Sequence, residues 1–347
     1  MVGKTATKVN KFGKAAAPIK NMAYLGRKDL EVVEIKDGVT AIGGRAFEDC
    51  TSLEAIVIPS SVATIAPDAF DGCVRLEKIE YSGPACRFEG GAMLSADGTR
   101  LLRWMGWLLE YAKAATVPDS VTVVEDKAFM VLRELESIRL PEGVTAIGEF
   151  AFSFCSALKS VVIPEGVEEI GGMAFWGCTA LESIVIPGSV TAIGHLAFRG
   201  CTVLKSFAIP DGVEKIGTET FQACTAMEEI ILPGSVTEIG RSAFHGCAAL
   251  KSFAIPASVT VIGDMAFCGC KALREIVLPA NLKRIGDNAF NGTGLRTVTI
   301  PASVESVGST AFAECGDLET AVVPAGLEAT MENQFKDCPK LKEILRY

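Results

Sequence analysis

A phenylalanine recurs every 23 residues along most of this 347-residue chain, and this repeat constrains the fold more than any other feature. The positions are Phe47, Phe70, Phe129, Phe152, Phe175, Phe198, Phe221, Phe244, Phe267, Phe290, Phe312 and Phe335. One step is a residue shorter, and the step from the second position to the third is 59 residues. A unit of about 23 residues cannot bury its own apolar face, so stacked units must share a core. The sequence therefore predicts a solenoid that grows by adding turns rather than separate domains.

The residues around each phenylalanine follow a fixed order. A representative unit reads LESIVIPGSVTAIGHLAFRGC over residues 181–201. The β-branched residues over 184–186 predict a strand, which should end at the following proline because proline lacks an N–H. The Ile-Gly pair predicts a second, short extended segment, and the Ala-Phe-to-Cys stretch is interpreted as one helical turn. Stacking should place about fourteen first strands in one continuous parallel sheet.

This frame resembles the BspA-like class of leucine-rich repeats, which occurs in many bacterial and protist surface proteins. The resemblance covers residues 30–346. Alanine precedes phenylalanine in ten of the twelve units, glycine lies four residues before it in nine, and cysteine lies three residues after it in ten. The resemblance implies an α/β fold, a right-handed β/α superhelix with its sheet on the concave face and short helical turns on the convex face. It also implies a protein-binding scaffold used in adhesion or surface recognition.

Two segments depart from the repeat. Residues 1–28 contain seven Lys or Arg residues and no acid, and we expect a basic N-terminal arm or cap, either solvated or in contact with an anionic surface. This segment lacks the apolar run of a signal peptide, which leaves both an intracellular protein and one with a removed signal open. The repeat region should then occupy residues 29–347, with an insertion at 82–114.

The insertion has its own predicted structure. The Asp97-Gly98 pair is a favoured two-residue turn and predicts a β-hairpin, and residues 107–114 suggest a short helix. The insertion also contains Trp104, Trp107 and Tyr111. Trp and Tyr are enriched at binding hot spots, so these residues are candidates for contacting a partner. The alternative is that they pack the insertion against the solenoid.

One row of strand residues is a second candidate binding surface. The residue between the two inward apolar residues of each strand should point outward. Over six consecutive units this residue is apolar: Val162, Val185, Ala208, Ile231, Ala254 and Val277. An apolar stripe on an open face often marks an interaction site. The alternative is that β-branched residues are present only because they favour strands.

Composition argues against several function classes. The net charge of −9 disfavours nucleic acid as the main partner, and no apolar run is long enough to span a membrane. No phosphate-binding loop, dinucleotide fingerprint or nucleophile elbow occurs, so no cofactor is expected. The two histidines, His195 and His245, lie two turns apart in variable positions that should be exposed, and no nucleophile is predicted near either.

Cysteine is the other reactive residue type. Ten of the twelve cysteines share one repeat position and should form a ladder of small buried thiols. Cys268 and Cys270 form the only close pair, which is too few ligands for a metal site. A reduced ladder is compatible with a cytosolic compartment.

These observations favour a non-enzymatic scaffold that binds a protein. An intracellular assembly or sensing module is the alternative, and a hydrolase that uses carboxylates or Cys268 is less favoured.

Overall fold

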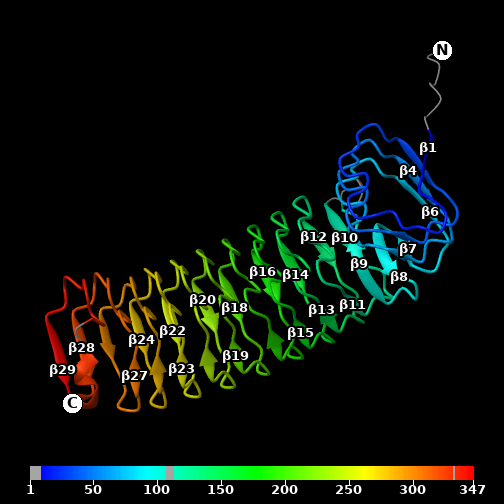
Figure 1. Ribbon diagram of the computed structural model, residues 1–347. Helices are drawn as coiled ribbons and strands as arrows, with labels where there is room; N and C mark the ends of the chain where they lie inside the picture. The colour runs from blue at the N-terminus through cyan, green and yellow to red at the C-terminus, as the bar shows by residue number, and fades with distance from the viewer. Residues whose placement is uncertain (1–8, 107–112, 331–332) are drawn as a thin grey trace.

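A computed structural model describes residues 9–106, 113–330 and 333–347 of the chain. The chain coils into a β-solenoid of about 14 turns, as the repeat predicts (Figure 1). Equivalent residues of successive turns pair in parallel, one repeat apart, as Ser160 does with Ser183. The 23-residue period is therefore also the hydrogen-bonding register of the stack.

The first strands of the turns lie side by side along one face, which we call the strand face. These strands are β1 (Val9–Phe12), β2 (Val32–Ile35), β4 (Ala55–Ile58), β6 (Lys78–Tyr81), β10 (Ala114–Thr116), β12 (Ser137–Arg139), β14 (Ser160–Val162), β16 (Ser183–Val185), β18 (Ser206–Ala208), β20 (Glu229–Ile231), β22 (Ser252–Ala254), β24 (Glu275–Val277), β26 (Thr297–Thr299), β28 (Thr320–Val323) and β29 (Glu343–Arg346).

The expectation of one continuous sheet is wrong. The first strands divide into sheets of four (β1-β2-β4-β6), four (β10-β12-β14-β16), two (β18-β20), two (β22-β24) and three (β26-β28-β29) strands. Most of these strands are three residues long, so the loss of a single ladder bond interrupts the sheet.

The Ile-Gly segments form a second row of two-residue strands, which we call the second ladder and which divides into three sheets. Its strands are β3 (Ala41–Ile42), β5 (Thr64–Ile65), β11 (Val123–Val124), β13 (Ala146–Ile147), β15 (Glu169–Ile170), β17 (Ala192–Ile193), β19 (Lys215–Ile216), β21 (Glu238–Ile239), β23 (Val261–Ile262), β25 (Arg284–Ile285) and β27 (Ser306–Val307). Glycine follows nine of these eleven segments and allows close stacking: a Cβ on Gly171 would lie 2.6 Å from the carbonyl carbon of Gly148 on the previous turn. Where two such glycines stack, as Gly171 does on Gly148, a side chain at this position would clash with the neighbouring backbone.

The stretch around each phenylalanine is not helical, which corrects the expected helical turns and the α/β class. Left-handed residues bracket the ring, as Met173 (φ 56°) and Gly177 (φ 73°) bracket Phe175. The Phe175 N–H donates to the Ala197 carbonyl of the next turn at 2.8 Å. Every second N–H of this segment thus bonds to the next turn, while those between bond locally, as Trp176 does to the Met173 carbonyl at 3.1 Å. A helix would instead bond each N–H within its own segment. The only helix in the described residues is a 3-10 helix at Ala325–Thr330.

Stacked rings form the centre of the solenoid. The phenylalanines of the repeat are buried, and neighbouring rings stack with centroids 4.8 Å apart for Phe129 and Phe152 and 5.5 Å apart for Phe198 and Phe221. The inward valines, isoleucines and leucines of the strands surround this ladder. However, the buried residues form two clusters rather than one, and the division falls at the insertion.

Residues 9–28 form the first turn of the stack. Strand β1 pairs with β2 at the repeat register, with Val9 opposite Val32. Tyr24 occupies the phenylalanine position and stacks on Phe47 with centroids 5.1 Å apart. This N-terminal segment therefore provides a first, divergent turn.

The insertion joins the two clusters. Its strands β7 (Cys86–Glu89), β8 (Ala92–Ser95) and β9 (Arg100–Trp104) are antiparallel, and the β8–β9 hairpin turns at the predicted position. Strand β9 also pairs in parallel with β11, so it extends the second ladder. On β8, Met93 packs into the first cluster while Ala92 and Leu94 pack into the second. The two faces of strand β8 thus pack into different cores.

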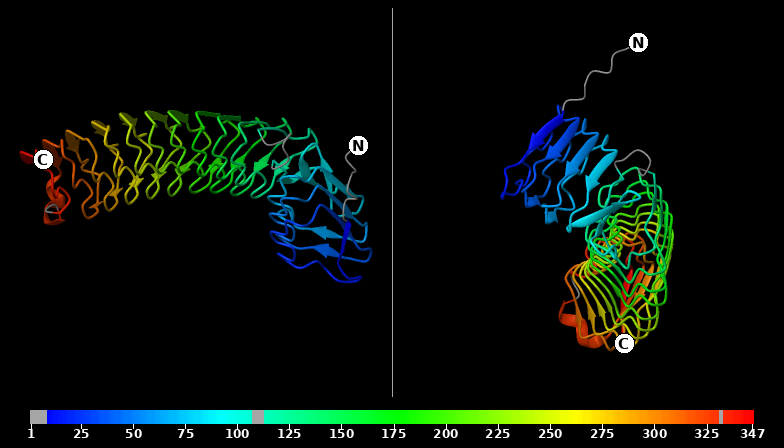
Figure 2. Two further views of the ribbon diagram at one scale, coloured as in Figure 1. Left: turned by 90° about the horizontal axis from the view of Figure 1, so that it is seen from above. Right: turned by 90° about the vertical axis from the view of Figure 1, so that its right-hand side faces the viewer.

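Strand β8 separates an N-terminal block (residues 9–81) from a C-terminal block (residues 100–347). The two blocks meet at an angle, while the C-terminal block itself runs as a nearly straight rod (Figures 1 and 2). At the C-terminus, Phe335 completes the ring ladder and strand β29 pairs with β28. The insertion is therefore the elbow of the molecule.

Removing a ring from the middle of the ladder should test the shared core. We expect Phe221→Ala to lower the free energy of unfolding by about 3–5 kcal/mol, because it leaves a cavity between two stacked rings. Urea denaturation followed by circular dichroism measures this change. Glu229→Ala, at an exposed position of the following turn, is the control and should change stability by less than about 0.5 kcal/mol. Equal losses of stability in the two variants would contradict a core that the turns share through the ring ladder.

Candidate binding surfaces

The six residues of the predicted apolar stripe are all exposed on the strand face. The exposed fraction is 66% for Val162 and 79% for Val277. They lie in register on adjacent strands, with Val162 opposite Val185 and Ala208 opposite Ile231. The alternating pattern of a strand explains this placement, because the flanking residues of the same strands point into the core. We call these six residues the stripe.

Charged residues run along one edge of the stripe. Each is the residue before its strand: Lys113, Glu136, Lys159, Glu182, Lys205, Glu228, Lys251 and Arg274. Glu136 lies between two lysines and forms ion pairs of 3.1 Å with Lys113 and 2.7 Å with Lys159. These two lysines lower the pKa of Glu136 by hydrogen bonding and charge. The edge is therefore solvated and charged, while the stripe itself is apolar.

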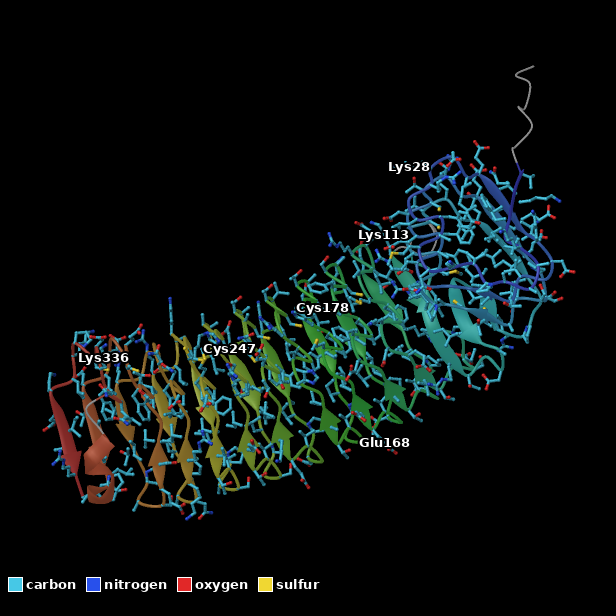
Figure 3. All side chains as sticks on the ribbon, viewed as in Figure 1. Lys28, Lys113, Glu168, Cys178, Cys247 and Lys336 are labelled. Carbon is cyan, nitrogen blue, oxygen red and sulfur yellow. The ribbon has the colours of Figure 1, made fainter. Side chains whose placement is uncertain are left out.

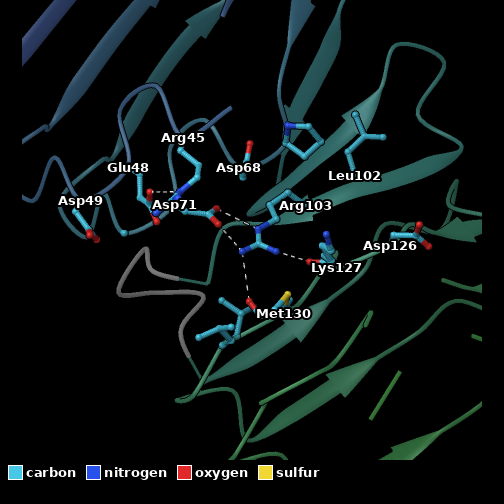
Figure 4. A pocket seen from close by; sticks show the side chains of 14 residues that line it. Arg45, Glu48, Asp49, Asp68, Asp71, Leu102, Arg103, Asp126, Lys127 and Met130 are labelled. Atoms are coloured by element: carbon cyan, nitrogen blue, oxygen red, sulfur yellow. Dashed lines mark hydrogen bonds and ion pairs between the residues drawn. The ribbon is translucent and has the colours of Figure 1, made fainter. Parts of the chain in front are cut away.

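A cleft of about 700 Å³ lies at the elbow and takes residues from both blocks (Figure 4). Its lining includes five carboxylates and three cationic side chains, together with the apolar Leu102, Met130 and Leu132. The charged residues are Arg45, Glu48, Asp49, Asp68, Asp71, Arg103, Asp126 and Lys127. No such cleft was expected, because its residues are far apart in the sequence.

Arg103 holds the elbow together. Its buried guanidinium donates to both carboxylate oxygens of Asp71 in the N-terminal block, at 3.1 and 2.6 Å. It also donates to the carbonyls of Lys127 and Met130 in the C-terminal block (Figure 4). Burial raises the pKa of Asp71, and the charge of Arg103 counteracts part of that rise. The ion pair thus positions the two blocks, and it has no local signal in the sequence because its partners are 32 residues apart.

The structure corrects the assignment of Trp104 to a partner-binding surface. Trp104 is only 1% exposed and stacks on Phe129 with centroids 5.7 Å apart. It takes the position of the phenylalanine in the first turn of the C-terminal block, so its role is packing. Trp107 and Tyr111 lie outside the described residues, as does most of the short helix expected over 107–114; Ala114 begins strand β10.

Comparison with known families identifies the repeat. A family model described as the BspA type leucine-rich repeat region, in six copies, matches residues 14–90, 111–228 and 237–345. These ranges cover most of the chain. The chain belongs to the BspA-type leucine-rich repeat family. A search of curated proteins finds no match to this BspA-type chain.

Solved structures include similar leucine-rich repeat proteins. One from Bacteroides ovatus has 26% sequence identity and a TM-score of 0.66, over 98% of this chain and 92% of its own. One from T. pallidum has 30% identity and a TM-score of 0.49, over 52% of this chain and 86% of its own. A leucine rich cell surface protein from Faecalibacterium prausnitzii has 26% identity and a TM-score of 0.48, over 95% of this chain and 83% of its own. The first of these supports the fold along the whole BspA-type array.

The cysteine ladder of this BspA-type array has a structural role. Sulfur atoms recur along the stack, where Cys178 and Cys247 are labelled in Figure 3. The Cys178 thiol donates to the Phe152 carbonyl of the previous turn at 3.1 Å, and the same carbonyl accepts from the Cys155 N–H at 3.1 Å. Each thiol is therefore a small donor that satisfies a carbonyl inside the core. All twelve cysteines are free thiols.

The other reactive side chains that the sequence singled out are Cys268 and the two histidines. Burial raises the pKa of the partly buried Cys268 thiol, which leaves it protonated and less nucleophilic near neutral pH. His195 is exposed as expected, whereas His245 is half-buried and lies 3.1 Å from the Gln222 side chain. No three His, Cys, Asp or Glu side chains among the described residues converge as metal ligands do.

The described segments also contain no helix with the length and apolar character that crossing a lipid bilayer requires.

Substitution of Arg103 should loosen the elbow. In Arg103→Ala, the Asp71 carboxylate and two carbonyls lose their donor, so we expect the free energy of unfolding to fall by about 3 kcal/mol. Small-angle scattering should show a broader range of angles between the blocks. Arg100→Ala on the same strand removes an exposed ion pair with Glu125 and serves as the control. Scattering curves that stay identical for wild type and Arg103→Ala would contradict the proposed role of Arg103.

Alkaline pH should destabilise the protein through the thiol ladder. Burial raises the pKa of Cys155 and Cys247 to about 12 and holds the pKa of Cys178 and Cys201 well above its ordinary value. Folding therefore binds protons above the unfolded thiol pKa of about 8.5. The stability contributed by the neutral thiols is complete below that pH and decreases as pH rises toward 12, by up to about 1.4 kcal/mol per pH unit for each thiol.

Denaturation at pH 8 and pH 10.5 measures this effect. The triple variant Cys178→Ala/Cys201→Ala/Cys224→Ala should lose less stability between the two pH values than wild type. An equal loss in both proteins would rule out buried neutral thiols as the cause.

Proposed function

We propose that this protein is a non-enzymatic scaffold that binds a protein partner through the stripe, in adhesion or surface recognition. The observation that carries the proposal is the unbroken row of exposed apolar side chains over six turns. Burying a valine or isoleucine side chain contributes about 1.5–3 kcal/mol, so a partner that covers the row gains a substantial driving force. The solvated charges along its edge would set the orientation of that partner.

The shape and charge of the strand face favour a protein over other ligands. Small-molecule sites are concave, whereas the stripe lies on an open row of strands. Nucleic acid binding needs a basic face, and the edge of the stripe alternates between lysine and glutamate. The insertion contributes to this proposal only through Trp107 and Tyr111, because Trp104 is buried in the core.

An intracellular assembly or sensing module is the second candidate function, and the ladder of free buried thiols favours it. Both candidates use the same surface and differ in compartment. Measuring export of the protein in its native host separates them: secretion favours surface recognition, and retention favours the assembly module.

Charge placed on the stripe should abolish partner capture. We expect Val185→Glu/Ile231→Glu to lose the partners that wild type captures from native lysate and medium, because two carboxylates would have to be buried at the interface. Quantitative mass spectrometry of the captured proteins is the measurement, and circular dichroism checks the fold.

Thr191→Glu/Thr237→Glu places the same charges on exposed residues of the same two turns, away from the stripe. This matched control should keep wild-type capture. If the stripe variant also keeps it, the stripe is not the binding site.

A further inference from the structure

In the stripe, the size of the outward residue varies with a period of two turns, in addition to the 23-residue repeat. Large and small outward residues alternate: Ala208 and Ala254 separate Val185, Ile231 and Val277. The charged edge alternates in the same phase, since Lys205 and Lys251 belong to the alanine turns and Glu182 and Glu228 to the large-residue turns. Over the four turns from Val185 to Ala254, the strand face therefore presents ridges with negative charge and hollows with positive charge.

Packing inside the solenoid does not account for the small outward residues. Phe207 and Phe253 point into the core next to Ala208 and Ala254, but inward and outward side chains lie on opposite faces and do not compete for space. An outward valine or isoleucine would fit there equally well.

Ion pairing within the chain accounts for only part of the charge pattern. Lys251 pairs with Glu228 at 2.5 Å. In the part of the chain that the structure describes, however, Glu182 and Lys205 take part in no ion pair, although they occupy adjacent turns. Two opposite charges at the centre of the stripe are thus left for an external partner.

We propose that the partner covering the stripe is a second copy of this chain, packed face to face about a two-fold axis that runs parallel to the strands between β18 and β20. This inference rests on the proposed function, because it uses the same stripe. The two-fold places Ala208 opposite Ile231 of the other copy, and Val185 opposite Ala254. In these central turns each ridge then enters a hollow, as close-packed interfaces require, whereas farther out Val162 meets Val277 of the other copy.

The same axis brings opposite charges together. Lys205 meets Glu228 of the other copy, and Glu182 meets Lys251, so both side chains left unpaired within the chain gain partners. Farther out, Glu136 meets Arg296 and Lys113 meets Glu319.

One like-charged pair, Lys159 with Arg274, remains in this arrangement. Within its own chain Lys159 already pairs with Glu136, and Arg274 already pairs with Asp317. An axis passing through a strand instead of between strands would place Lys205 against a second lysine, which the charge pattern disfavours.

The straight C-terminal block lets two such faces meet along their length (Figure 2). The contact face would extend over ten turns from β10 to β28, which are about 4.8 Å apart, and over four residues of each strand. These dimensions give a buried area of roughly 600 Å² for each copy. A total of about 1,200 Å² is at the low end of specific interfaces. We therefore expect a reversible dimer with a dissociation constant in the micromolar range.

Charge exchange across the axis tests the proposal. Sedimentation equilibrium of the full chain should show a concentration-dependent dimer. Lys205→Glu and Glu228→Lys alone should each weaken dimerisation at least about tenfold, because each creates two like-charged contacts. The double variant Lys205→Glu/Glu228→Lys restores opposite charges across the axis and should recover the wild-type dissociation constant to within about threefold. Lys215→Glu, which breaks the ion pair with Glu238 on the second ladder of the same turns, is the matched control and should leave the dimer unchanged.

Crosslinking tests the register. Glu182 and Lys251 lie three turns apart, roughly 14 Å within one chain, so a zero-length carbodiimide crosslink between them can form only between copies. Its presence in the dimer band supports the proposed axis. A chain that stays monomeric up to about 0.5 mM, a dimer insensitive to the single reversals, or a dimer band without this crosslink would each overturn the proposal. If the chain is monomeric and Val185→Glu/Ile231→Glu still loses captured proteins, this inference fails while the proposed function stands.

Discussion

The hydrogen bond from the phenylalanine N–H to the carbonyl of the next turn, present in ten of the twelve units, is the interaction on which the rest of the structure depends. For Phe152 and Phe221 the bond lengths are 2.7 and 2.8 Å. The bond requires left-handed residues on both sides of the ring, and it directs the polar backbone of this segment toward neighbouring turns. As a result, each turn satisfies its buried backbone groups only when another turn lies beside it.

This dependence on neighbours explains both the regular and the irregular parts of the molecule. Where the repeat is intact, residues one period apart stack and the interior continues from turn to turn. The insertion interrupts both rows of strands. Strand β5 ends one sheet of the second ladder, beyond the insertion β9 pairs with β11 in another sheet, and Trp104 starts a new ring ladder. The elbow is therefore the place where one stack of turns ends and the next begins. The ion pair of Arg103 with Asp71 holds the angle between the two blocks. An open strand face and a closed interior follow from the same arrangement.

Much of this could be predicted from the sequence, because the period fixes which residues stack. The inward phenylalanines, the thiol ladder and the exposure of Val185 and Ile231 all follow from strand alternation and the 23-residue step. The helical turn expected for the Ala-Phe segment is wrong, because an apolar pair flanked by polar residues is compatible with a helical turn as well as with two tight turns. The left-handed residues that distinguish the two, such as Met173, have side chains that do not reveal their backbone conformation.

Two other features could not be predicted: the residues that replace phenylalanine in the ring ladder, and the contacts between residues far apart in the sequence. Tyr24 and Trp104 occupy ring positions, but a search for phenylalanine alone places them outside the repeat. The contact between Arg103 and Asp71 depends on the angle between blocks, which no local pattern encodes. The stripe is the surface left for a partner. At its positions, packing in the core does not determine which side chain is present.

Native-state hydrogen exchange of the phenylalanine amides is the most direct measurement of the central claim. If these N–H groups bond to the next turn, the amides of Phe152, Phe175, Phe198 and Phe221 should be among the slowest to exchange, and protection should decline toward both ends of the C-terminal block. Exchange of these amides as fast as that of exposed turn residues such as Gly188 would show that the turns do not share their backbone bonds, and would contradict the account.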